Sequence, residues 1–125
     1  MKKLFAAFLV LNFLVEAFAG SALIAGPGGL SAAGSGNQWS MHYGFAVLAI
    51  ASASLWVWPR RADYQVVTAV LGVLMVFHCA LVVSLATAGD QQVGFIIHSV
   101  FAASSIALFA LRARWCNAPV SKESL

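Results

Sequence analysis

The chain has 125 residues, of which 62% are hydrophobic and only 9% are charged, with a formal net charge of +3. An ordinary soluble domain carries roughly a quarter charged residues, and a chain this short has too little interior to bury so much apolar surface. The composition therefore excludes a soluble domain and predicts that the chain has lipid as its solvent. Nucleic acid is excluded as a partner, because the sequence has no basic patch interleaved with aromatic residues.

Four apolar runs follow one another along the chain, each close to the ~20 residues that a helix needs to cross a bilayer. They cover residues 4–25, 40–58, 66–88 and 93–111. The connections between consecutive runs are short, which favours antiparallel neighbours. The predicted fold is all-α, an integral membrane up-down-up-down four-helix bundle. It forms a single four-span domain over residues 1–115, followed by a cytoplasmic tail at 116–125.

The basic residues predict the orientation. All seven lie at chain ends or connections on one side of the predicted membrane: Lys2, Lys3, Arg60, Arg61, Arg112, Arg114 and Lys122. The connections 26–39 and 89–92 contain neither Lys nor Arg. By the positive-inside rule both termini are cytoplasmic and these two connections face outward. The expected location is the inner (plasma) membrane of the cell, with multiple passes.

Aromatic residues lie near the predicted ends of the spans, where amphipathic rings anchor a protein at the headgroup level. Trp39 and Tyr43 fall at the outer interface, whereas Trp56, Trp58 and Trp115 fall at the inner one. We expect all five to be interface anchors.

The spans contain five polar residues that are unexpected in lipid: Asn12, Glu16, His42, His78 and His98. An ionisable group at the centre of a bilayer costs about 2.5–3.5 kcal/mol or more, so these side chains are expected to face the interior of the bundle. A rise of about 1.5 Å per residue places Glu16 and His78 roughly 13–15 Å from the outer helix ends, His98 roughly 8 Å and His42 roughly 3 Å. The four ionisable groups would then form a ladder that leads inward from the outer side.

Several chemistries suit this polar cluster. His78, His98 and Glu16 are candidate metal ligands, since imidazoles on different helices can hold haem iron or copper. The difference in depth of about 7 Å between His78 and His98 weighs against a shared ion. Glu16 and His78 could instead exchange a proton, bind the head group of a quinone, or simply form a structural hydrogen-bonded pair.

An independent enzyme is not expected. The sequence has no nucleophile–base pair or phosphate-binding loop, and no extramembrane domain that could hold a substrate. Its two cysteines, Cys79 within the third span and Cys116 in the tail, form no C-x-x-C pair. They therefore indicate neither thiol–disulfide exchange nor a thiolate zinc site.

Two segments resemble the small four-helix membrane proteins of the DoxX-like family. The stretch 71–78, LGVLMVFH, is similar to the third helix of that family, and 13–23, FLVEAFAGSAL, is similar to its first helix. The resemblance implies an accessory redox or stress-related component of a membrane complex.

Two alternatives from other classes stay open. A Glu midway through the first of four short spans, followed four residues later by Gly20, is also similar to the small multidrug resistance exporters, in which Glu16 would exchange protons for a cationic substrate. The chain could instead be a structural subunit that binds other membrane subunits, or copies of itself, through small residues such as Ser99, Ala103 and Ala107.

Overall fold

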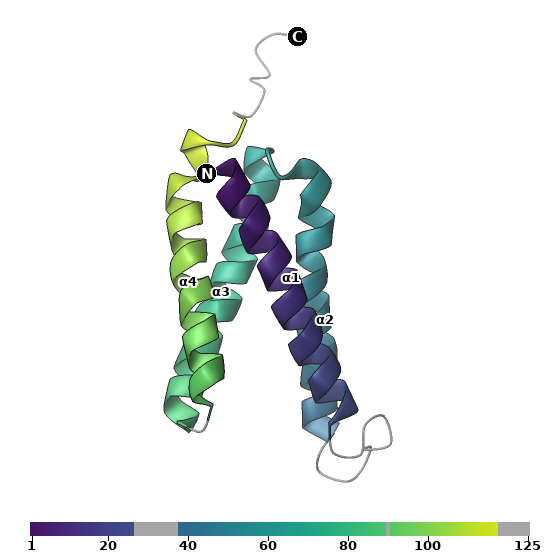
Figure 1. Cartoon of the computed structure of the whole chain (residues 1–125). Helices are drawn as coiled ribbons and strands as arrows, with labels where there is room; N and C mark the ends of the chain where they lie inside the picture. The colour runs from purple at the N-terminus through teal and green to yellow at the C-terminus, as the bar shows by residue number, and fades with distance from the viewer. Residues whose placement is uncertain (27–37, 90, 118–125) are drawn as a thin grey trace. The chain divides into compact units, whose positions relative to one another are not determined.

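The computed structural model describes residues 1–26, 38–89 and 91–117. Its elements are the helices α1 (Lys2–Ala25), α2 (Gln38–Val57), α3 (Tyr64–Ala88) and α4 (Gln92–Leu111), with short 3₁₀ segments η2 (Trp58–Arg60) and η3 (Arg112–Arg114) (Figure 1). The predicted all-α class is confirmed. The helices α1, α2, α3 and α4 are each long and apolar enough to cross a membrane.

Each helix begins one or two residues before its apolar run, and at α3 a capping residue accounts for the earlier start. α3 begins at Tyr64, and the carboxylate of Asp63 accepts hydrogen bonds from the backbone N–H groups of Gln65 at 2.9 Å and Val66 at 3.1 Å. These bonds satisfy donors that the first turn of a helix leaves free. α2 ends at Val57 and continues as the 3₁₀ segment that contains Pro59, a residue that cannot donate to a helical hydrogen bond.

By their internal contacts the residues form two compact units. The first contains Met1–Phe8 and the chain from Val57 onward, and the second contains Leu9–Trp56. Each unit is built around an antiparallel helix pair, α3 with α4 in the first and α1 with α2 in the second.

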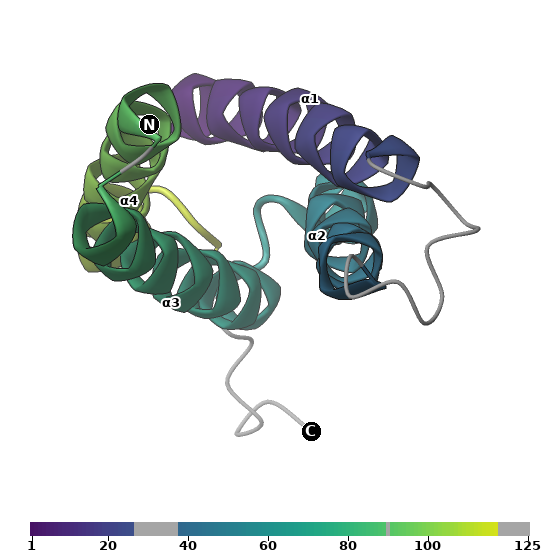
Figure 2. The same ribbon diagram turned by 90° about the horizontal axis from the view of Figure 1, so that it is seen from below.

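In the first unit, α3 and α4 form a tight hairpin and lie side by side in both views (Figures 1 and 2). α3 ends at Ala88 and is capped by Gly89, whose φ of 73° is the left-handed conformation that favours glycine. The N–H of Gly89 donates to the carbonyl of Leu85 at 2.9 Å, which closes the last turn of α3. Large apolar side chains fill the hairpin, and the buried ones include Val67, Leu71, Leu74, Phe101 and Leu108.

The basic end of the first unit is held by contacts of Arg112 and Trp115. Arg112 donates to Thr68 Oγ1 at 2.9 Å, and its guanidinium lies 5.3 Å from the centre of the Tyr64 ring. The Trp115 ring packs on Phe5 at 5.0 Å between centroids. These contacts connect the end of α4 to the starts of α3 and α1.

In the second unit, α1 and α2 approach each other closely at two glycines. A Cβ added to Gly20 would lie 2.8 Å from the carbonyl oxygen of Gly44, and one added to Gly44 would lie 2.7 Å from the carbonyl oxygen of Gly20. Ser40 Oγ donates to the Leu23 carbonyl at 3.3 Å beside this crossing. Small residues permit such backbone proximity, which is a main source of helix association in lipid.

We expect Gly44→Ala to destabilise the α1–α2 pair by about 1–3 kcal/mol, because overpacking forces the backbone to move. The added methyl group would meet backbone atoms of Gly20 and Ile24, which cannot rotate away. Unfolding of the purified protein in mixed micelles of mild detergent and SDS measures the change.

Gly72→Ala is the matched control. Its Cβ would meet only Phe109 Cε2, at the ordinary contact distance of 3.9 Å. Replacing a helical Gly with Ala is then expected to be neutral or to stabilise by up to about 1 kcal/mol. Equal stability of the two variants would contradict the close crossing.

Candidate functional site

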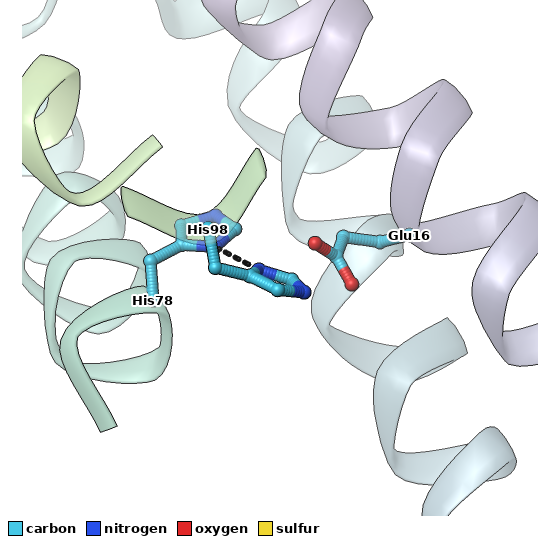
Figure 3. Close-up of side chains that lie close together, drawn as sticks. All are labelled: Glu16, His78 and His98. Atoms are coloured by element: carbon cyan, nitrogen blue, oxygen red, sulfur yellow. Dashed lines mark hydrogen bonds between the residues drawn. The ribbon is translucent and has the colours of Figure 1, made fainter. Parts of the chain in front are cut away.

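The hairpin of the first unit brings two histidines into contact. His78 comes from α3 and His98 from α4, and their Nδ1 atoms lie 3.1 Å apart, within hydrogen-bonding distance (Figure 3). His78 is fully buried and His98 is partly buried. Figure 3 also draws Glu16, which belongs to the second unit. The contact between the two imidazoles is the central feature of the site, and we call it the histidine pair.

Aromatic rings hold the histidine pair in place. The Phe101 ring stacks on His78, with centroids 4.8 Å apart and planes 16° from parallel. Phe77 presents its ring edge-on to His78 at 5.2 Å and to His98 at 6.3 Å. Both imidazoles are therefore packed against aromatic rings, and a hydrogen bond inside a protein is stronger than one in water.

The hydrogen bond requires the two rings to have different protonation states at Nδ1. A neutral imidazole carries a proton on one nitrogen only, so one Nδ1 must be the N–H donor and the other the lone-pair acceptor. The acceptor ring then carries its proton on Nε2, or the pair as a whole carries one extra proton. Such an arrangement can exchange a proton between two helices without moving either backbone.

The sequence predicts a difference in depth of about 7 Å between His78 and His98, which weighs against a shared ion. The estimate assumes straight helices that start at one level. In the structure the two side chains nevertheless bring their Nδ1 atoms to 3.1 Å.

The polar residues of α1 lie in the second unit. Asn12 is buried and its Nδ2 donates to Ser54 Oγ of α2 at 3.1 Å. Glu16 lies one turn further along α1 and is 1% exposed. Within this unit the structure thus pairs Asn12 with a hydroxyl on the neighbouring helix, which the sequence analysis did not identify.

His42, the third predicted histidine, lies in the second unit near the start of α2. Its side chain is exposed, and its ring is 6.1 Å from that of Trp39 in an edge-on arrangement. Of the three histidines, the structure joins His78 and His98.

Four of the five predicted anchors have exposed side chains: Trp39, Tyr43, Trp56 and Trp58. Trp115 differs, because it is 6% exposed and packs on Phe5. Its ring therefore connects α4 to the start of α1 within the first unit and is not an anchor that faces the lipid interface.

The sequence analysis did not identify Phe101 or Ser54 as partners of the polar residues. A signal for Phe101 was present: it lies three residues after His98, on the same face of a helix. Ser54 was one of several small hydroxyl residues in α2, and nothing in its spacing distinguished it from Ser52, which bonds to its own helix at the Ala49 carbonyl.

The histidine pair can bind a proton or a metal ion. Neutral imidazole nitrogens are good ligands for copper, zinc and iron. A haem with two axial imidazoles, however, needs its porphyrin plane between them, and two Nδ1 atoms 3.1 Å apart leave no space for it. The geometry therefore favours a small cation over haem.

No protein-family model, curated protein or solved structure matches the chain.

We predict that the two rings have different tautomers. The His42→Gln variant leaves His78 and His98 as the only histidines of the chain. With ¹⁵N-labelled histidine, we expect the NMR spectrum of this variant to show one ring protonated at Nδ1 and a second protonated at Nε2. Two rings protonated at Nε2 alone would contradict the hydrogen bond.

Proposed function

We propose that the chain is an accessory component of a redox complex in the inner membrane, of the DoxX-like type, and that its histidine pair exchanges protons during electron transfer. The observation that supports the proposal is the contact of His78 with His98 between two apolar helices. The resemblance of residues 71–78 to the third DoxX-like helix includes one member of this pair.

The cost of two imidazoles among apolar helices favours a functional role. Each ionisable group within the membrane is expensive, and groups that are kept there commonly form proton relays. Asn or Gln could supply a structural hydrogen bond between α3 and α4. An imidazole pair adds the ability to take up a proton on one ring and release one from the other.

Redox chemistry in membranes needs such proton exchange. A quinone that accepts two electrons also takes up two protons to become a quinol. Under this proposal the electrons come from another subunit of the complex, and the histidine pair delivers protons one at a time. The histidine pair would then take up new protons from the aqueous side of the membrane.

We expect the His78→Gln variant to lower quinone-linked electron transfer at least about threefold in native membranes, relative to the matched His42→Gln variant. Glutamine keeps the hydrogen-bonding ability of the side chain and removes its ability to titrate. Oxygen uptake driven by a respiratory substrate measures the rate. Equal rates in both variants, at equal protein levels, would contradict the proposal.

Efflux of a cationic dye from proteoliposomes that is lost in Glu16→Gln would favour the exporter alternative.

We also propose that both termini are cytoplasmic. The support is the distribution of basic residues, which all lie in the first unit, at the start of α1, after α2 or after α4: Lys2, Lys3, Arg60, Arg61, Arg112 and Arg114. The connections that contain no Lys or Arg would then face outward.

Labelling of Cys116 tests this topology. In a Cys79→Ser background, an impermeant maleimide is expected to label Cys116 in inside-out vesicles and not in intact cells. Burial raises the pKa of the Cys116 thiol, and nearby Lys2 and Arg112 oppose this effect. Because the thiolate is the reactive form, labelling should be slow at neutral pH and faster in alkaline buffer. Labelling of intact cells would contradict the proposed orientation.

A further inference from the structure

The distance between the two imidazole nitrogens suits a shared metal ion. The Nδ1 atoms of His78 and His98 are 3.1 Å apart. Bonds from a transition metal to imidazole nitrogen are about 2.0–2.1 Å long, so an ion bound to both would have an N–metal–N angle of about 100°. This value lies between the roughly 90° of square-planar and the roughly 109° of tetrahedral coordination.

Aromatic packing already fixes the positions of both rings. Phe101 stacks on His78 at 4.8 Å, and Phe77 borders both imidazoles. The hairpin turn at Gly89 joins the two helices that carry the ligands. Ligands whose rings are locked by packing lose little freedom when they bind a metal.

We propose that His78 and His98 supply two ligands of a site for a divalent transition metal, Cu²⁺ or Zn²⁺. The inference goes beyond the proposed redox role and does not depend on it, because an ion bound to both Nδ1 atoms would replace the hydrogen bond between the two rings. Two imidazoles leave coordination positions open for water or a carboxylate, as in metal sites that react with a substrate.

Metal binding leaves the number of protons on the histidine pair unchanged. In the metal-free neutral pair, one ring donates its Nδ1–H to the lone pair of the other. When the ion binds, the donor ring moves this proton to its own Nε2, and both Nδ1 lone pairs form bonds to the metal. No proton leaves the pair, and no electron is transferred.

Electron paramagnetic resonance with Cu²⁺ alone tests the site. The full chain would be purified in mild detergent with a tag that lacks histidine and stripped of metal, and one equivalent of Cu²⁺ would be added. The chain has three histidines, so the His42→Gln variant retains only the pair. Two coordinated imidazole nitrogens per copper in this variant would identify His78 and His98 without any change at the site. One coordinated imidazole, or none, would overturn the proposal.

Replacing each metal-ligating histidine gives the second measurement. His78→Gln and His98→Gln are each expected to weaken Cu²⁺ binding at least about 100-fold, more than the 10–100-fold typical of losing a group that only orients a ligand. Zn²⁺ affinity, measured by competition with a chromophoric chelator, should fall in parallel. Circular dichroism in the same detergent confirms that each variant is helical. Wild-type affinity in a folded His78→Gln/His98→Gln double variant would overturn the proposal.

Discussion

Backbone peptide groups in hydrocarbon have no water to bond to, so each must find its partner within the protein. The chain meets this constraint with four helices of 20 to 25 residues. Hydroxyl side chains follow the same rule, because Thr68, Ser99 and Ser105 each donate to a carbonyl three or four residues earlier in the same helix. The donor bond of each of these hydroxyl groups is thus made within its own helix.

The two helix pairs meet the packing requirement in different ways. α1 and α2 use Gly20 and Gly44, whose missing side chains let the two backbones touch. α3 and α4 are held at the distance that large side chains such as Leu74 and Phe101 require. Space between α3 and α4 therefore exists for ring-sized groups, and two of the rings are imidazoles. A glycine crossing at this place would leave no room for the histidine pair.

Much of the fold follows from the sequence, because hydropathy and helix length act on each span separately. The span at 66–88 predicted α3 to within two residues at its start, where Asp63 caps a helix that begins at Tyr64. The burial of Asn12, Glu16 and His78 likewise follows from the cost of polar groups in lipid. The contact of His78 with His98 could not be predicted in this way, since it depends on the stagger of two helices. Residue spacing along each helix gives a depth, whereas the contact also depends on how the two side chains lie, and these bring their Nδ1 atoms to 3.1 Å.

Within the described residues, each helix pair contains a hydrogen bond between side chains of its two helices, and these two bonds differ in chemistry. Asn12 and Ser54 are neutral at every physiological pH, so their hydrogen bond can only fix the register of α1 against α2. The histidine pair fixes the register of α3 against α4 equally well, but its members can also bind a proton or an ion. If register were the only requirement, an amide and a hydroxyl would meet it in both hairpins at lower electrostatic cost. The presence of two imidazoles in α3 and α4 therefore points to chemistry in that hairpin. The Asn12–Ser54 hydrogen bond between α1 and α2 shows, within the same chain, what a purely structural polar contact looks like.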